Sequence, residues 1–176
     1  YLVEFNLRRD ASSKFGKDKQ VGYFPSVGLG WLLSKESFMK GLDPYVQNVK
    51  LRGSWGKLGN DRNNGDPNSE NYFPALAFYG NVGYSYGGSQ VSGLERSKFG
   101  NRMLAWEESE NKEVGLEFST FKNKAYVEVN YYNKLTSGIL VPEQLPLTTG
   151  NTSAPIVNSA AMRNSGIELN LTWKDK

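Results

Sequence analysis

Oxygen-bearing side chains gather in one polar stretch, GNDRNNGDPNSEN, which covers residues 59–71. The members that could bind a metal ion are Asp61, Asn63, Asp66 and Glu70. Carboxylate and amide oxygens are the ligands that Ca²⁺ prefers, but the glycine position and the acid spacing differ from those of an EF-hand loop. A polar, turn-rich loop tip accounts for the same residues without a metal. We favour that interpretation and keep the four residues as candidate cation ligands.

A second group is aromatic and follows directly, in the stretch NYFPALAFYGNVGYSYGG. Aromatic rings with polar tips can hold a ligand by packing and hydrogen bonding. They can equally pack a compact loop onto itself, which is the simpler role for any single member. As a group they form the candidate ligand or partner surface of this chain: Tyr72, Phe73, Phe78, Tyr79, Tyr84 and Tyr86.

Catalytic chemistry is poorly supported. The sequence has neither histidine nor cysteine, which removes the commonest general base, the usual triad partner and the thiolate ligands of zinc. The acids Glu107, Glu108, Glu110 and Glu113 could suggest a glycosidase pair, but Lys112 lies among them and they begin an alternating strand. We expect no enzyme, no catalytic residue and no cofactor.

The composition favours strands. The chain has 176 residues, of which 13% are aromatic, and it contains 19 glycines. No stretch approaches the roughly 20 consecutive apolar residues of a spanning helix. The net charge of +3 comes from scattered cations, so we do not expect nucleic acid as a partner.

Apolar and polar residues alternate with period two in six segments, as in strands with two different faces. These segments are residues 1–8, 23–33, 49–55, 113–119, 125–134 and 167–173. Two connections are compact, SKESFMKGLDPYVQN and FKNKA, and three are long and polar, at residues 9–22, 59–102 and 142–163. If the strands run up and down in order, the compact turns share one side and the long loops the other. That asymmetry is typical of outer-membrane barrels.

Two architectures fit this alternation. A soluble antiparallel sandwich would bury the apolar face, and a membrane barrel would turn it to lipid. Two features favour the barrel: polar residues line the opposite face, and tryptophans lie near both ends of the strands. Trp31 and Trp173 fall near the compact turns, whereas Trp55 and Trp106 fall near the long loops, as in aromatic girdles. In the strand VKLRGSW, Val49, Leu51 and Trp55 share one face and Lys50, Arg52 and Ser54 the other; in a barrel these would be the lipid side and the lumen side.

Several stretches, in order, resemble the SusC/RagA-like TonB-dependent transporters of the Bacteroidetes outer membrane. They are RRDASSKFGKDKQVGYFPSVGLGWLLSKESFM, VKLRGSWGKLGN, LAWEESENKEVGLEF, NYYNKLTSGIL and MRNSGIELNL. The family pattern has RxDGSSRF before a G-x-FPS strand, then a tryptophan, an E-x-FM turn and an LKLRxSxGxxGN strand. Ala11 departs from it where glycine is usual.

The resemblance implies an all-β, antiparallel transmembrane barrel of 22 strands with long external loops and short periplasmic turns. This chain would supply about six of those strands. Residues 1–176 are then expected to be a partial barrel domain, with the plug domain and the TonB box absent. Alone, such a sheet would leave two open edges.

The resemblance also implies the function and partners: import of a large nutrient, an oligosaccharide or oligopeptide, across a Gram-negative outer membrane. TonB would act through an N-terminal segment that this chain lacks, and a SusD-like surface lipoprotein would cap the barrel. Outer-membrane lipid would surround it, and two transporter–lipoprotein pairs could associate as a homodimer. The alternative from another class is a soluble β-sandwich module that binds carbohydrate or mediates adhesion.

Overall fold

The computed structural model describes residues 1–42, 45–62, 72–146, 148 and 154–175. Within them the chain forms eight strands and three short 3₁₀ helices. In order they are β1 (Leu2–Ala11), η1 (Lys17–Lys19), β2 (Val21–Leu32), η2 (Leu33–Lys35), η3 (Ser37–Leu42), β3 (Val46–Asn60), β4 (Phe78–Tyr86), β5 (Ser89–Lys98), β6 (Glu107–Thr120), β7 (Ala125–Pro142) and β8 (Ile156–Trp173). Of the helices in this described part, none has the length and apolar character needed to cross a membrane.

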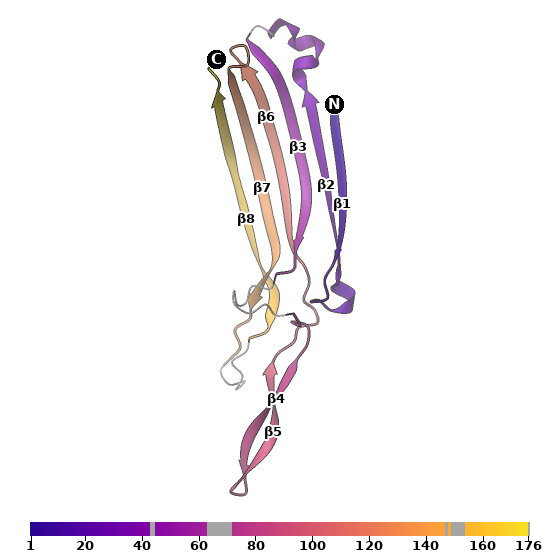
Figure 1. Cartoon of the computed structure of the whole chain (residues 1–176), viewed down its shortest axis with the longest axis vertical. Coiled ribbons are helices and arrows are strands. Elements are labelled where there is room, and N and C mark those ends of the chain that lie inside the picture. The colour runs from indigo at the N-terminus through magenta and orange to yellow at the C-terminus, as the bar shows by residue number, and fades with distance from the viewer. Residues whose placement is uncertain (43–44, 63–71, 147, 149–153, 176) are drawn as a thin grey trace.

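Six strands form one antiparallel sheet in the order β1-β2-β3-β6-β7-β8. Strands β4 and β5 pair only with each other and extend as a separate ribbon beyond one end of the sheet (Figure 1). The sheet is not closed, because β1 and β8 are its two outer strands in the described part of the chain. The six predicted segments and their antiparallel order are confirmed.

The connections divide between the two ends of the sheet as predicted. The described parts of the compact connections, residues 33–42, 45 and 121–124, lie at the end where the C-terminus also lies (Figure 1). The second one is a tight turn in which Phe121, Lys122 and Asn123 all have positive φ, and the Lys124 N–H donates to the Phe121 carbonyl at 3.2 Å. The described parts of the longer connections, residues 12–20, 61–62, 72–106, 143–146, 148 and 154–155, lie at the other end, which we call the loop end.

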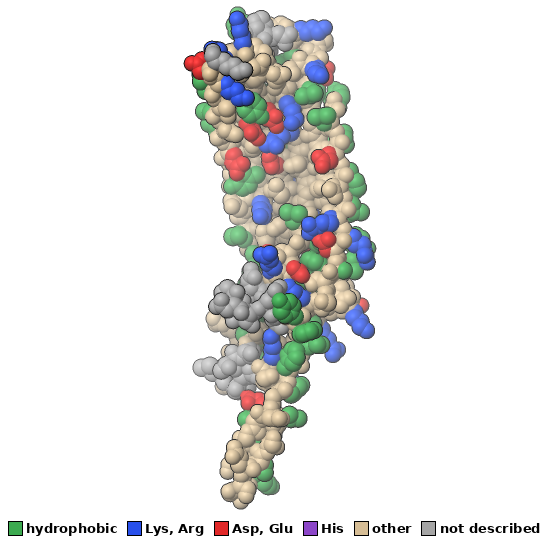
Figure 2. All heavy atoms as spheres, viewed as in Figure 1, with side chains coloured by type: hydrophobic (Ala, Val, Ile, Leu, Met, Phe, Trp, Pro, Cys, Tyr) green, Lys and Arg blue, Asp and Glu red, His purple; other side chains and the backbone are tan. Residues whose placement is uncertain are grey.

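The apolar face of the sheet is exposed. Figure 2 shows acidic and basic side chains across the face turned to the viewer, with hydrophobic side chains mainly along the edges. The apolar side chains of the other face keep large exposed fractions, among them Val3 (76%), Val114 (56%), Ile167 (74%) and Leu169 (62%). In the part of the chain that the structure describes, no second sheet covers them.

The accessible surface is too large for a compact globule. It measures 12,698 Å², whereas a compact monomer of 19.7 kDa would expose roughly 8,600 Å². A β-sandwich of this mass would have buried that difference between its two sheets. The single-layer sheet is therefore the geometry of a barrel wall, and it does not support the sandwich alternative.

The apolar side chains of the outer face form a band across the sheet. Its border on the loop-end side runs obliquely to the rows of residues that are paired across the strands. One row is apolar or glycine on all six strands: Val3, Leu29, Gly53, Val114, Tyr131 and Ile167. The next row on the same face changes from apolar to polar between β3 and β6: Phe5, Val27 and Trp55, then Lys112, Asn133 and Ser165.

On β1 the band continues to Leu7, whereas on β8 it ends at Ile167, in the row of Val3. The border thus shifts by about four residues, roughly 13 Å, over five interstrand spacings of about 4.8 Å. The strands are therefore tilted by roughly 30° from the direction perpendicular to the border, which is near the strand tilt of 35–45° in membrane barrels.

Three sequence expectations are wrong in detail. Val49 is only 7% exposed, because it adjoins a register shift between Gln47 and Lys50 on a strand against which η2 packs. The loop predicted over residues 142–163 is shorter, since β8 begins at Ile156; residues 156–166 lack strict alternation. Trp106 does not belong to a girdle, since it packs against the buried cluster of the loop end.

Candidate functional site

The inner face of the sheet carries an ion-pair network centred on Arg52. Its Nη2 atom lies 3.1 Å from a Glu113 carboxylate oxygen and 2.6 Å from one of Glu128. The same nitrogen donates to Asn130 Oδ1 at 2.8 Å. Glu117 joins from β6, at 3.3 Å from Arg52 Nε. These residues come from β3, β6 and β7, so one guanidinium links three neighbouring strands.

Glycine at position 115 makes this crossing feasible. A Cβ atom on Gly115 would lie 2.2 Å from Asn130 Oδ1 and 2.7 Å from Arg52 Nε. Arg52 therefore passes over the bare backbone of β6 to reach Glu128 on β7. The prediction that Arg52 lies on the polar face is confirmed, and so is that of Lys50, whose Nζ is 3.4 Å from Glu117.

At the loop end a small apolar cluster joins the long connections. Its buried members are Phe15 (2% exposed), Leu104 (0%) and Leu140 (8%), and Trp106 and Ile156 pack against them. The Trp106 indole N–H donates to the Gln20 carbonyl at 3.2 Å. The cluster ties the β1–β2 connection to the segment before β6 and to β7 and β8, so these loops have defined positions.

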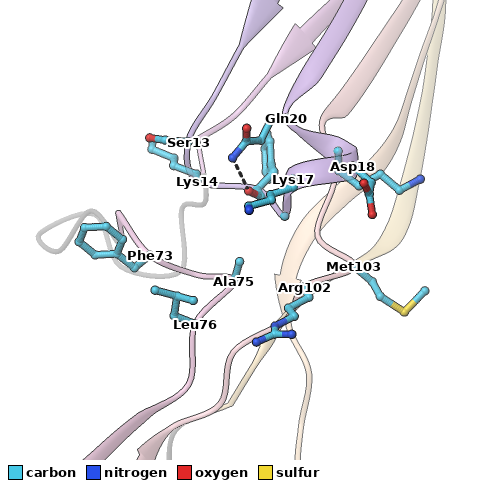
Figure 3. A pocket seen from close by; sticks show the side chains of 13 residues that line it. Ser13, Lys14, Lys17, Asp18, Gln20, Phe73, Ala75, Leu76, Arg102 and Met103 are labelled. Carbon is cyan, nitrogen blue, oxygen red and sulfur yellow. Dashed lines mark hydrogen bonds between the residues drawn. The ribbon is translucent and has the colours of Figure 1, made fainter.

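Beside this cluster lies a pocket of about 710 Å³, which we call the loop-end pocket. Its walls are the β1–β2 connection on one side and segments 73–76 and 102–103 on the other (Figure 3). The side chains that line it are Ser13, Lys14, Phe15, Lys17, Asp18, Lys19, Gln20, Phe73, Ala75, Leu76, Arg102 and Met103. The volume is within the range of small-ligand sites.

Comparison with known proteins decides the family. The model of the family described as "TonB dependent receptor-like, beta-barrel" matches residues 1–174. The chain belongs to this family. TonB-dependent receptor P39 of Formosa agariphila is 36% identical over 174 residues, which are 99% of this chain and 16% of that receptor. TonB-dependent receptor SusC of Bacteroides thetaiotaomicron is 30% identical over 175 residues, 99% of this chain and 17% of SusC.

Solved structures are also similar to this chain. The RagAB peptide importer in its "closed-closed" state superposes with a TM-score of 0.78 at 26% identity, covering 99% of this chain and 18% of that one. This TonB-dependent receptor barrel chain thus spans about a sixth of the length of the curated relatives it matches. The family and these relatives are receptors or transporters rather than enzymes.

The six aromatic residues predicted as a surface of this TonB-dependent receptor chain do not form one cluster. Phe73 lines the loop-end pocket, and Tyr72 lies beside it with its ring centroid 5.9 Å from Lys14 Nζ. The other four lie on the β4–β5 ribbon. All six are exposed, at 59% for Tyr72, 58% for Phe73, 42% for Phe78, 61% for Tyr79, 54% for Tyr84 and 80% for Tyr86. Whether they bind a ligand or a partner stays a prediction.

The ribbon itself was missed, because residues 59–102 were expected to be loop throughout. Its turn is Gly87-Gly88, with φ of +59° and +81°, conformations that favour glycine in a two-residue hairpin. A Gly-Gly pair between NVGYSY and SQVSGLERS is the signal that could have identified it. Residues such as Arg102 and Lys17 carried no such signal, since only the tertiary fold brings them to one pocket.

Of the candidate cation ligands, Asp61 is engaged within the protein. Its Oδ2 accepts a hydrogen bond from Ser12 Oγ at 2.9 Å and lies 3.8 Å from Lys14 Nζ. Asn63, Asp66 and Glu70 lie outside the described residues. Among those described, no three acidic side chains are grouped so as to hold a metal ion. The cation site stays untested.

Proposed function

We propose that this chain is the later part of the barrel wall of an outer-membrane transporter that imports a large nutrient, with energy supplied through TonB. The observation that carries the proposal is the single-layer sheet with an apolar outer face and an ion-paired inner face. Such a sheet is stable only when lipid covers one side and water or protein the other. The family match supports the transporter class.

For the nutrient, we propose an oligomer of a few sugar or amino-acid units. The similar RagAB structures are of a peptide importer, which supports an oligopeptide. An oligosaccharide is the alternative that the sequence resemblance implies. We further propose a SusD-like surface lipoprotein as the partner at the loop end. The β4–β5 ribbon supports this, because an isolated two-stranded ribbon is marginally stable in water and this one exposes several aromatic side chains.

Uptake by living cells tests the proposal. The gene for the full-length transporter is deleted in its host, and the cells are given labelled oligopeptides and oligosaccharides of graded length. We expect uptake of one class to fall to background and to return when the gene is restored. Deleting TonB instead should give the same loss. Uptake that survives both deletions for every oligomer would contradict the proposal.

A further inference from the structure

We propose that the loop-end pocket binds a carboxylate group of the imported oligomer, an inference that rests on the proposed function. The pocket would recognise the carboxylate together with the apolar surface next to it. Two kinds of nutrient carry this chemistry, an acidic oligosaccharide and a peptide with a free C-terminus. The inference concerns the shared group, and the experiment separates the two sources.

Charge is the first argument. Four cationic side chains line the pocket, Lys14, Lys17, Lys19 and Arg102, against the single carboxylate of Asp18. The lining therefore carries three more cations than acids, as many as the excess of 21 cations over 18 acids in the whole chain. In Figure 3, Lys17 and Arg102 extend toward segment 73–76, whereas Asp18 extends the other way. The pocket is thus lined by a cation on each wall.

The two cations play different roles. A guanidinium presents parallel N–H donors that match both oxygens of a carboxylate, whereas an ammonium acts as a compact point charge. Arg102 is suited to orient the group and Lys17 to add attraction from the opposite wall. Lys14 is already held near Asp61 at 3.8 Å and near the ring of Tyr72, so it shapes the wall rather than meeting the ligand.

Apolar side chains stand beside the cations. Phe73 is 58% exposed and Leu76 48% exposed, and both line the pocket with Phe15. Charges at a wet surface add little to affinity on their own, but apolar and aromatic surface next to them can cover the carbon face of a sugar ring or an aliphatic side chain. The combination distinguishes a ligand site from a solvated basic patch.

The walls are fixed before any ligand arrives. In the β1–β2 connection, the Ser12 N–H donates to the Gln20 carbonyl at 3.0 Å, and Gln20 Nε2 donates to the Phe15 carbonyl at 3.3 Å. In the opposite wall, the Asn101 N–H donates to the Pro74 carbonyl at 2.9 Å, and this bond joins the two segments that form that wall. Since a pre-formed site loses little entropy on binding, this geometry favours recognition over a passing contact.

The test measures binding to the purified full-length transporter in detergent by calorimetry. The probes are two matched pairs: trigalacturonic acid and its methyl ester, and N-acetyl-tetraalanine with a free or an amidated C-terminus. We expect the acid of one pair to bind at least tenfold more tightly than its neutral partner, with affinity falling as salt is raised. The pair that responds identifies the source of the carboxylate.

Variants assign the effect to the pocket. Lys17→Gln and Arg102→Gln together should abolish the preference for the acid, and Arg102→Lys should lose part of it because the paired donors are gone. Lys122→Gln, at the opposite end of the sheet, is the control and should bind as the unaltered protein does. Equal binding of acid and neutral probes, or an unchanged preference in the double variant, would overturn the inference. The proposed function would still stand in that case if cells took up neutral oligomers through the transporter.

Discussion

At the residue scale, the ion-pair network of the inner face depends on the long side chain of Arg52 and on the absence of a side chain at Gly115. Arg52 reaches two strands beyond its own, with carboxylate oxygens of Glu113 and Glu128 at 3.1 and 2.6 Å. Its path is open only because position 115 lacks a side chain. Cross-strand ion pairs usually join direct neighbours; here the glycine extends the reach and links β3, β6 and β7 through a single cation.

Gly115→Ala should therefore displace Arg52 from Glu128 and Asn130. We expect the barrel of the full-length transporter to lose about 1–3 kcal/mol of stability, the usual cost of breaking a partly buried network. The measurement is the temperature at which the folded band disappears in semi-native electrophoresis. Gly53→Ala is the matched control, because the nearest atom to its added Cβ would be the Glu113 carbonyl oxygen at an ordinary 3.9 Å. An equal shift in both variants would argue against the network.

At the element scale, each strand of the sheet has a lipid side and a lumen side, and β8 shows the division along its length. Ile167, Leu169 and Leu171 are 74%, 62% and 66% exposed on one face. Their neighbours Glu168 and Asn170 share rows with the inner network. Toward the loop end, Ile167 is the last apolar residue of this series, and the next residue on the same face is Ser165. The border of the lipid-facing band therefore lies between those two residues.

Leu169→Arg should impair assembly of the barrel, because a cation would face hydrocarbon at a cost of about 2–4 kcal/mol near the bilayer midplane. Asn170→Arg changes the next residue on the opposite face and should have a much smaller effect. The amount of folded transporter recovered in the outer-membrane fraction is the readout. Similar losses for the two variants would count against a lipid-facing side.

The border is tested by a second pair on the same face. Ile167→Arg should reduce assembly, whereas Ser165→Arg should be nearly neutral, since a cation beyond the apolar band can reach the headgroups. The same membrane fractionation compares them. If Ser165→Arg were as harmful as Ile167→Arg, the oblique border and the strand tilt inferred from it would be incorrect.

The β4–β5 ribbon should be dispensable for folding but required for the partner. Phe78 and Lys98 are paired at its base, so a short Gly-Ser linker can replace residues 78–98 without opening the sheet. We expect normal outer-membrane insertion together with reduced recovery of the surface lipoprotein when the transporter is purified by affinity tag. Loss of insertion would show that the ribbon supports the barrel itself.

At the scale of the whole molecule, the described chain is a wall rather than a globule. Its buried apolar residues are few, and its buried cluster of Phe15, Leu104 and Leu140 lies at the loop end, where β7 ends, rather than along the length of the sheet. The two outer strands also present unpaired backbone groups. Both features require surroundings: lipid on the outer face, and further strands at β1 and β8.

Residues 1–176 expressed alone should therefore not give a stable water-soluble monomer. We expect inclusion bodies or a detergent-dependent aggregate with strand-rich circular dichroism, because the open edges favour pairing between copies. Size-exclusion chromatography with light scattering provides the measurement. A monodisperse monomer that melts cooperatively in plain buffer would contradict the barrel-wall interpretation and favour the soluble module.

The sequence by itself determined the six strands of the main sheet, their two faces and their order, because alternation with period two depends only on local chain geometry. Residues 113–119 and 167–173 alternate strictly and lie within β6 and β8. Local pattern was less informative at Val49, where a register shift changes the surroundings, and at residues 156–166, which pair with β7 although their own alternation is weak.

Only the tertiary structure decided which distant residues meet. The loop-end pocket joins Lys17 to Leu76 and Arg102, and Gly115 opens the path of Arg52 to Glu128. Neither arrangement has a sequence signature, because each depends on strand register and loop closure between segments far apart in the chain. The exposed apolar face was likewise settled in three dimensions. A sandwich and a barrel share the same alternation, and they differ only in whether a second layer covers it.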